Sequence, residues 1–250
     1  MLKVRFQAVR LTKKYPLAIS RGVSTGSLNL FVFAEQDGHV GLGECAPGTG
    51  FDETLADLAT TQLTQLVESG IEGLSVAEIV QRGVDMGVDA SALAGLDVAL
   101  WDLLAKRADL PLYELFGLSP RSVPTSVTIG INPVDVIRER VPEILSRTGG
   151  RFLKIKLGTP EGFERDQENY LAAQEASASF GVGLRVDANG GWDAPTAIMM
   201  MNWLSERNCD YVEQPLARGD EENLKQVFAA RRLPLYVDES VRVASDVIAL

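Results

Sequence analysis

The first part of the 250-residue chain alternates apolar and polar positions in the manner of β-strands. Two such runs cover residues 4–11 and 28–33, and a loop of small residues, 21–27, lies between them. The turn sequence Asp37-Gly38 then leads into a third alternating run, residues 40–45. This pattern predicts a three-stranded antiparallel meander.

Helical spacing replaces strand spacing after about residue 51. Apolar positions three and four residues apart recur over 52–69, 76–82 and 90–108, and the last segment places Leu93, Leu96 and Leu100 on one stripe. A short helical run, 111–117, ends at a glycine. Together with the meander, these helices predict an α+β domain over residues 1–120.

From about residue 121, strand-like and helix-like segments alternate. The expected strands are 124–130, 151–157, 182–187, 210–213 and 234–238, each followed by a helical segment. This alternation predicts βα units and a parallel sheet over residues 121–250. Polar residues follow the carboxyl ends of the strands, which is where active sites form in (β/α) barrels.

The number of strands falls short of a closed barrel. Five are expected in residues 121–250, whereas a closed barrel of this kind needs about eight. The final residues, 245–250, have a helical pattern with no stop signal. We therefore expect a partial barrel that stops after its fifth strand, and a natural chain that continues for roughly another 80–120 residues.

Composition narrows the possible partners. A net charge of −10 argues against nucleic acid, because binding to phosphate backbones needs clustered lysine and arginine. The absence of an apolar run of about 18 residues argues against a membrane-spanning segment. Cys45 and Cys209 lie far apart and form no CxxC pattern, which favours a reducing cytoplasm. A small-molecule substrate and a homo-oligomer are the partners that we expect.

Three acidic residues follow strand-like runs at nearly equal intervals. Asp187, Glu213 and Asp238 are separated by 26 and 25 residues, close to the length of one βα unit. In a parallel sheet their carboxylates would project from the same rim. Mg²⁺ prefers such oxygen ligands, and no histidine or cysteine lies nearby in a zinc-ligand pattern. The spacing therefore predicts a site for one Mg²⁺.

Two lysines end the preceding strand-like run. The spacing of Lys154 and Lys156 places both side chains on one face of a strand. Mutual repulsion and a nearby cation would both favour the neutral amine, so one lysine could act as a base near neutral pH. A lysine base beside Mg²⁺ suits removal of the proton α to a carboxylate or carboxamide, because the cation stabilises the resulting enediolate.

Several motifs together resemble those of the enolase superfamily, muconate-lactonizing subgroup. The motifs are Lys154-Ile155-Lys156, Val186-Asp187-Ala188-Asn189-Gly190-Gly191-Trp192, Val212-Glu213-Gln214-Pro215-Leu216, Val237-Asp238-Glu239-Ser240, Gly41-Leu42-Gly43-Glu44-Cys45-Ala46-Pro47 and Ala99-Leu100-Trp101-Asp102. The resemblance spans the whole chain. It implies an N-terminal capping domain that governs substrate specificity, followed by a barrel of the modified TIM type that carries the metal site and the general base.

The resemblance also implies a role for each site residue. The Mg²⁺ ligands would be Asp187, Glu213 and Asp238. Lys156 would be the general base and Lys154 its electrostatic partner. Asn189 and Glu239 would lie on the rim and hold ligands and water in place.

Within this subgroup, the chain most resembles dipeptide epimerases of the L-Ala-D/L-Glu type. The similarity lies in Ser20-Arg21-Gly22 and Thr125-Ser126-Val127-Thr128-Ile129-Gly130, and it implies that Arg21 and Thr128 contact the substrate. These epimerases carry a second lysine after the sixth barrel strand and a later Asp-x-Asp element, and neither occurs in residues 1–250. Only half of a two-base site is therefore visible.

Three functions remain open from the sequence. The first is a Mg²⁺-dependent isomerase that inverts one α-carbon of a small dipeptide. The second is a lyase similar to o-succinylbenzoate synthase, in which Lys156 would assist a syn-dehydration. The third is a catalytically inactive, truncated protein that only binds metal. The intact carboxylates and lysines favour the first.

Overall fold

The computed structural model describes the backbone of residues 1–250 and the side chains of all of them except Ala249. The chain forms two compact units. One comprises Met1–Tyr15 and Ser24–Ser122, and the other comprises Pro16–Val23 and Val123–Leu250. The division at residue 120 expected from the sequence stays a prediction. The segment Pro16–Val23 belongs to the second unit although it lies within the first part of the chain.

The first unit contains most of the predicted three-stranded meander, whose first two strands include residues of Pro16–Val23 at one end. Its strands are β1 (Lys3–Ile19), β2 (Gly22–Gln36) and β3 (His39–Cys45), in that order across the sheet. β2 and β3 pair antiparallel through the Asp37-Gly38 turn. The loop expected at residues 21–27 is wrong, because β2 already begins at Gly22. Pairing with the neighbouring strand overrides the weak strand preference of these small residues.

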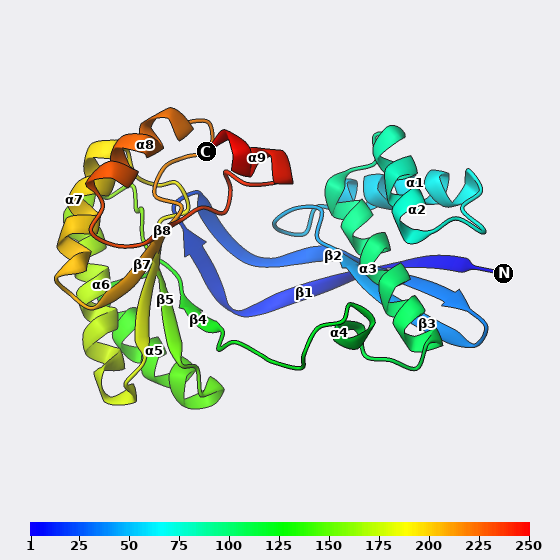
Figure 1. Cartoon of the computed structure of the whole chain (residues 1–250). Coiled ribbons are helices and arrows are strands. Elements are labelled where there is room, and N and C mark those ends of the chain that lie inside the picture. Colours follow the sequence, from blue (N-terminus) through cyan, green and yellow to red (C-terminus); the bar gives the residue numbers. More distant parts are fainter. The chain divides into compact units, whose positions relative to one another are not determined.

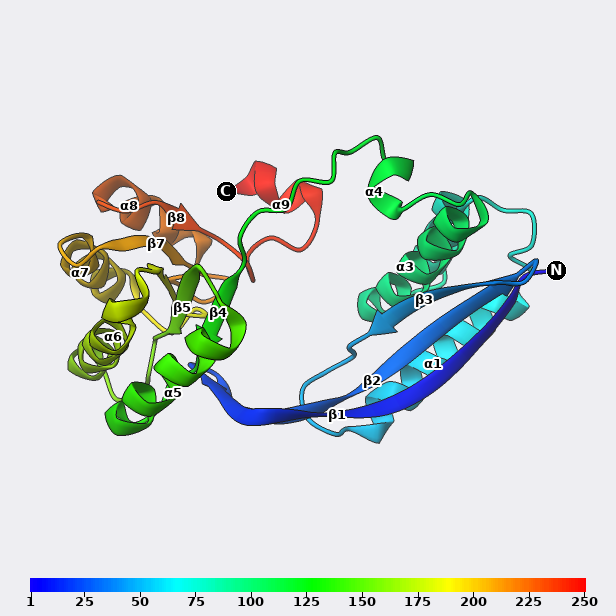
Figure 2. The same cartoon turned by 90° about the horizontal axis from the view of Figure 1, so that it is seen from below.

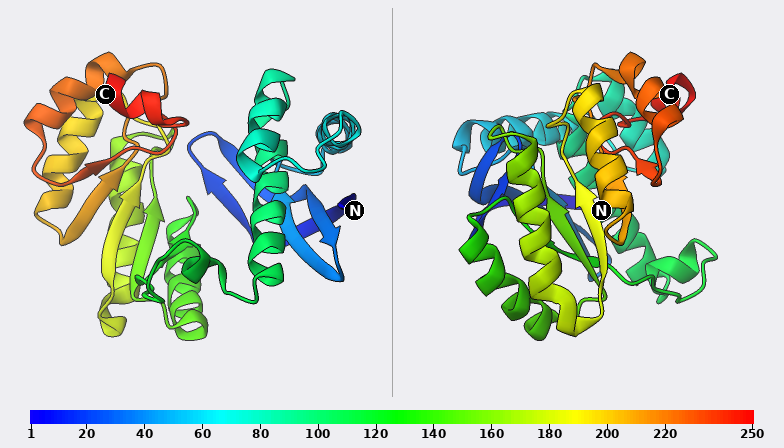
Figure 3. Two further views of the ribbon diagram at one scale, coloured as in Figure 1. Left: turned by 45° about the vertical axis from the view of Figure 1, so that its right-hand side comes forward. Right: turned by 90° about the vertical axis from the view of Figure 1, so that its left-hand side faces the viewer.

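Helices cover this sheet (Figure 3). They are α1 (Glu53–Glu68), α2 (Val76–Asp85), α3 (Ala90–Arg107) and the short α4 (Leu112–Leu115). α3 packs so closely on β3 that a Cβ at Gly43 would collide with the carbonyl oxygen of Gly95. This close approach explains the glycines at alternate positions of β3. The core between the helices and the sheet includes Leu30, Val32 and Leu96.

The second unit is a five-stranded parallel sheet with helices between its strands (Figure 1). The strands, in spatial as well as sequence order, are β4 (Ser126–Ile129), β5 (Phe152–Lys156), β6 (Gly183–Asp187), β7 (Cys209–Glu213) and β8 (Leu235–Tyr236). The helices are α5 (Val134–Thr148), α6 (Phe163–Ser177), the 3₁₀ turn η1 (Ala178–Phe180), α7 (Ala194–Ser205), α8 (Glu221–Ala230) and α9 (Ala244–Ala249). The predicted order of five βα units is confirmed.

The two faces of this parallel sheet differ in character. Helices α5, α6, α7 and α8 lie along one face (Figure 2), and Leu153 and Ile155 of β5 are buried in the core on that side. Lys154 and Lys156 alternate with them and are only partly buried, so they project from the other face. Among the described helices, none combines the length and apolar character that crossing a bilayer requires.

Candidate active site

The strand register aligns three of the predicted site residues at the carboxyl rim of the sheet. Lys156 pairs with Asp187 across β5 and β6, and Asp187 pairs with Glu213 across β6 and β7. The three residues therefore form a row of neighbours, although 31 and 26 residues separate them in sequence. Asp238 lies two residues beyond the end of β8.

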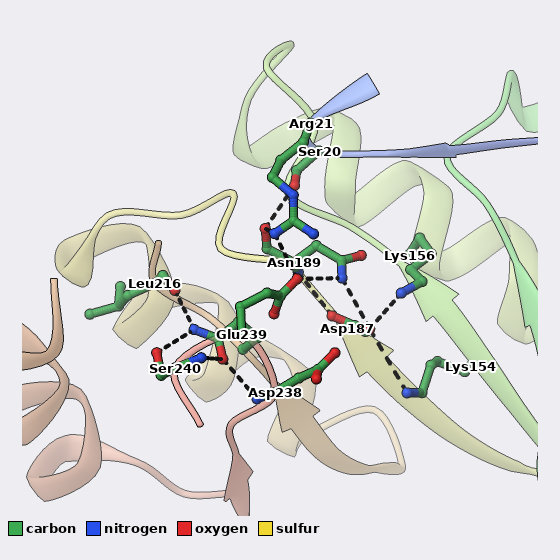
Figure 4. Close-up of polar contacts among 11 residues, drawn as sticks. Ser20, Arg21, Lys154, Lys156, Asp187, Asn189, Leu216, Asp238, Glu239 and Ser240 are labelled. Carbon is green, nitrogen blue, oxygen red and sulfur yellow. Dashed lines mark hydrogen bonds and ion pairs between the residues drawn. The ribbon is translucent and has the colours of Figure 1, made fainter. Parts of the chain in front are cut away.

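Lys156 and Asp187 are in direct contact. Lys156 Nζ lies 2.5 Å from Asp187 Oδ2 (Figure 4), and the Asp187 side chain is only 1% exposed. The other carboxylate oxygen, Oδ1, accepts a hydrogen bond of 2.9 Å from the backbone N–H of Asn189. A buried carboxylate needs such partners because it has lost the water that would solvate it. Asp187 is thereby held in one orientation beside the lysine.

Lys154 joins two of the carboxylates. Its Nζ donates to both oxygens of Glu213, at 2.7 and 2.9 Å, and lies 3.8 Å from Asp187 Oδ2. Burial lowers the pKa of Lys154, but the hydrogen bond to Glu213 and the charges of Glu213 and Asp187 outweigh burial, and the net pKa is raised. Lys154 is therefore held as an ammonium by these carboxylates, and the expectation that one lysine of the pair acts as a neutral base stays a prediction.

Glu213 experiences opposing influences. Burial raises its pKa, and the hydrogen bond from Lys154 lowers it, while the like charge of Asp187 raises it further. The net pKa is raised. Two carboxylates close enough to disfavour each other's charge are an arrangement that a cation would stabilise.

Asp238 is attached to the rim through its backbone. Its N–H donates a hydrogen bond of 2.8 Å to Gln214 Oε1. The side chain is exposed, and its carboxylate extends to the side on which Asp187 and the two lysines lie (Figure 4). Within the part of the chain that the structure describes, no group of three or more acidic, histidine or cysteine side chains has converged into a metal-binding cluster. Lys154 and Lys156 instead neutralise two of the expected ligands.

The donor atoms at the rim nevertheless fit a hard divalent cation. The carboxylates of Asp187, Glu213 and Asp238 supply only oxygen ligands, which Mg²⁺ prefers. Two further oxygens beside them, Asn189 Oδ1 and Glu239 Oε2, are buried and have no hydrogen-bond partner. Buried acceptors are rarely left without partners in folded proteins, and a bound cation or its water would provide one.

Asn189 and Glu239 are held together at the rim. Asn189 Nδ2 donates to Glu239 Oε1 at 3.1 Å and lies 3.4 Å from Asp187 Oδ2. Asn189 has a positive φ of 45°, and Gln214, which follows Glu213, has a φ of 40°. Non-glycine residues rarely adopt this conformation, and such strain often occurs at functional sites. Gln214 directly follows Glu213, and Asn189 lies two residues after Asp187.

Arg21 reaches the same rim from the turn between β1 and β2. Its Nη1 lies 2.6 Å from Glu239 Oε1 and donates to the carbonyl oxygen of Asn189 at 3.1 Å. Ser20 Oγ donates to that carbonyl as well, at 3.0 Å. Burial raises the pKa of Glu239, but the hydrogen bonds from Asn189 and Arg21 lower it by more. The charge of Arg21 is therefore already paired within the protein.

Thr128 lies next to Lys154 in the sheet. It is in β4, one residue before the last position of the strand, and pairs with Lys154 in the parallel register. Its side chain is partly buried. This position places Thr128 on the face that carries the lysines, level with Lys154 and two residues short of the level of Lys156.

Reasoning from the sequence missed the role of Gln214. Its buried amide donates to the Leu216 carbonyl oxygen at 2.8 Å and to Ser240 Oγ at 2.9 Å, while its oxygen accepts from the backbone of Asp238 and Ser240. These contacts use the full capacity of the amide to donate and accept. The motif Glu213-Gln214-Pro215 was the only signal in the sequence, and it does not reveal these partners.

Comparison with known families gives matches over most of the chain. A family profile described as the mandelate racemase / muconate lactonizing enzyme, N-terminal domain, matches residues 1–117. A second profile, described as enolase C-terminal domain-like, matches residues 136–250. The two matches follow one another along the chain without overlap.

Individual relatives match the chain over nearly its whole length. Two proteins named hydrophobic dipeptide epimerase, from a Flavobacteria bacterium and from Roseobacter litoralis, are each 49% identical to this chain over 98% of its length. The matched regions make up 70% and 71% of the two relatives. A crystal structure of a dipeptide epimerase from Enterococcus faecalis, complexed with Mg and the dipeptide L-Leu-L-Tyr, has a TM-score of 0.88 and 32% identity. That match covers 99% of this chain and 70% of the other. The chain spans about 70% of the length of these relatives.

Proposed function

Because the chain belongs to the mandelate racemase / muconate lactonizing enzyme family of the enolase superfamily, we propose that it is a Mg²⁺-dependent dipeptide epimerase. The observation that carries the proposal is the contact between Lys156 and Asp187, 2.5 Å from Nζ to Oδ2. This contact sets a candidate base beside a candidate metal ligand. The two relatives that are 49% identical and the Mg-bound structure of a dipeptide epimerase support the same activity.

Lys156 is the proposed general base. Its side chain is 12% exposed, so the amine is reachable from the rim yet shielded from bulk water. Asp187, Glu213 and Asp238 would hold Mg²⁺, and when bound this ion supplies positive charge that offsets the negative charge developing as the α-proton leaves. Lys156 would accept that proton on Nζ, and inversion requires a second proton carrier to deliver a proton to the opposite face of the substrate.

Lys154 has a different proposed role. It stays protonated because Glu213 and Asp187 raise its pKa. An ammonium in this position contributes fixed positive charge next to Lys156 and to the carboxylates of Asp187 and Glu213. Lys154 would therefore stabilise negative charge at the rim, without transferring the proton itself.

The substrate class follows from Arg21. An arginine that is free to pair with a ligand would favour dipeptides with an acidic side chain. Here Glu239 already pairs with Arg21 at 2.6 Å, so binding an acidic side chain would require breaking that contact. We place the substrate among dipeptides with apolar side chains, in keeping with the two relatives that are 49% identical. This differs from the L-Ala-D/L-Glu-like substrate expected from the sequence, whose second residue is acidic.

Deuterium exchange tests this proposal. The full-length protein is incubated in D₂O with an apolar dipeptide such as L-Leu-L-Tyr, with Mg²⁺ or with EDTA, and the α-protons are followed by ¹H NMR. We expect deuterium at one α-carbon and conversion to the epimer, both dependent on Mg²⁺. No exchange in the presence of Mg²⁺ with any apolar or acidic dipeptide would contradict the proposal.

The same spectra distinguish the lyase alternative. A syn-dehydrating enzyme would remove a β-leaving group and produce an alkene signal, whereas an epimerase conserves the carbon skeleton. The relatives support the epimerase. A homo-oligomer and a cytoplasmic location stay predictions, the second supported by Cys45 and Cys209, which are both buried and unbridged.

A further inference from the structure

Asp166 is a buried acidic residue to which the proposed chemistry gives no role. It lies in the first turn of α6 and is 1% exposed. Burial of a carboxylate is costly unless hydrogen bonds replace its water. Burial raises the pKa of Asp166, and the hydrogen bonds from Trp192, Thr159 and Gly158 oppose that rise without cancelling it. The burial of the Asp166 carboxylate at this cost in free energy therefore indicates a structural role for its hydrogen bonds.

The partners of Asp166 are all N–H donors. Gly158 N lies 3.0 Å from Oδ1 and 2.9 Å from Oδ2, and Thr159 N lies 3.1 Å from Oδ1. The indole Nε1 of Trp192 donates to Oδ2 at 2.7 Å. Gly158 and Thr159 belong to the loop after β5, whereas Trp192 belongs to the loop after β6. One carboxylate thus holds two loops that are distant in sequence.

These two loops are the ones that follow the proposed base and a proposed metal ligand. Gly158 comes two residues after Lys156, and Trp192 comes five residues after Asp187. The Leu157 N–H also donates to the Asp187 carbonyl oxygen at 3.0 Å. Any movement between the loops would therefore change the separation of Lys156 and Asp187.

The loops touch backbone to backbone beside Asp166. A Cβ at Gly158 would lie 2.5 Å from the Ala188 carbonyl oxygen, and a Cβ at Gly191 would lie 2.5 Å from the Gly158 carbonyl oxygen. Gly158 also has a φ of 82°, which a side chain would strain. Glycine at both positions permits the close approach, and the carboxylate of Asp166 fixes it.

We propose that Asp166 is a positioning residue, which fixes the loop after Lys156 against the loop after Asp187 and so keeps the base in register with the metal site. This inference rests on the proposed function. Asp166 touches neither Lys156 nor Asp187 and acts only through Gly158, Thr159 and Trp192. Residues that orient catalytic groups from behind are typically worth 10–100-fold in activity or metal affinity.

The substitution Asp166→Asn tests whether Asp166 positions the two loops or only stabilises the fold. The amide retains one oxygen but introduces an NH₂ group, so whichever way it lies, two donors face each other. If the amide oxygen stays with Gly158 and Thr159, the conflict is with the indole N–H, and Trp192→Phe removes it. Glu164→Gln is the matched control, since Glu164 lies in the same helical turn and is exposed.

The measurements are kcat and KM for α-proton exchange of an apolar dipeptide, and hydrogen exchange of the Gly158 and Thr159 amides. We expect Asp166→Asn to lower kcat about 10–100-fold and to leave KM within about threefold, with faster amide exchange at both positions. The double variant Asp166→Asn/Trp192→Phe should recover at least about threefold in kcat, because the two sites are coupled. Glu164→Gln should match the wild type.

Three results would overturn the role of Asp166 while the wild type remains active. They are an Asp166→Asn enzyme with kcat within twofold of the control, a loss confined to KM, and amide exchange at Gly158 and Thr159 that is no faster than in the control. If Asp166→Asn does not fold, Trp192→Phe alone must still lower kcat and speed exchange of the Gly158 amide. An inactive wild type would instead refute the proposed function itself.

Discussion

The side-chain oxygen of Gln214 accepts a hydrogen bond of 2.8 Å from the backbone N–H of Asp238. Gln214 immediately follows Glu213, so one buried amide links two of the proposed metal ligands through the main chain. Asp238 itself lies beyond the last regular strand residue, where the sheet no longer fixes its position. The amide of Gln214 supplies the restraint that the strand lacks.

Removing that amide should weaken the metal site. Gln214→Ala is expected to reduce Mg²⁺ affinity about 10–100-fold and to destabilise the fold by roughly 1–3 kcal/mol, because the Asp238 and Ser240 N–H groups lose a buried acceptor. Titration calorimetry with Mg²⁺ and thermal unfolding measure the two effects. Gln226→Ala, at an exposed position, is the control. Equal Mg²⁺ affinity in the two variants would refute this account of Gln214.

Breaking the contact between Arg21 and Glu239 should change substrate preference. In Glu239→Gln, Arg21 loses its charged partner and becomes available to a substrate carboxylate. The ratio of kcat/KM for an acidic dipeptide to that for an apolar dipeptide should rise about tenfold, equivalent to about 1.4 kcal/mol. The ratio is the measured quantity, because the substitution also lowers absolute activity at the rim. Glu222→Gln, which is exposed, should leave the ratio unchanged, and a similar ratio in both variants would argue against this basis for specificity.

Cys209 makes stability depend on pH in the alkaline range. Burial raises the pKa of its thiol from 9.0 to about 12. The thiol donates a hydrogen bond to the Tyr211 carbonyl oxygen. Between those pH values the unfolded chain releases a proton that the folded chain keeps. The stability due to this shift is therefore fully present below pH 9 and is lost as the pH rises towards 12.

Replacing the thiol should remove that dependence. Urea unfolding of the wild type is expected to lose up to about 1.4 kcal/mol per pH unit more than Cys209→Ala does above pH 9. Cys209→Ala will be less stable overall because a buried group is lost, so the comparison concerns slopes and not absolute values. Parallel slopes for the two proteins would show that the thiol is not protected from ionisation in the fold.

Much of the fold could be predicted because local patterns and long-range pairing agree. The capping meander, the five parallel strands and the helices between them follow from apolar periodicity, and the family matches confirm the predicted fold class of a capping domain and a barrel-type domain. The exception is residues 21–27. Their small side chains favour a loop, yet pairing across a long two-stranded segment makes them part of β2.

The candidate site was predictable where it depends on strand register and not where it depends on side-chain partners. Equal spacing along the chain is enough to bring Lys156, Asp187 and Glu213 into one row. It does not reveal that Lys154 is paired with Glu213, a contact that raises the pKa of this lysine. Asp166 and Gln214 escaped notice for the same reason, since their importance lies in the backbone groups that they bind.

The most direct test of the account is isotope exchange by Lys156→Ala. In D₂O with Mg²⁺, the wild type should introduce deuterium at the α-carbon starting from either epimer of an apolar dipeptide. If Lys156 serves one face of the substrate, the variant of the full-length protein should lose exchange from one epimer only. The second lysine that the family resemblance implies for the other face would still remove the proton from the second epimer. Equal loss from both epimers in a folded, Mg²⁺-binding variant would contradict the assignment of Lys156 as the base for a single face.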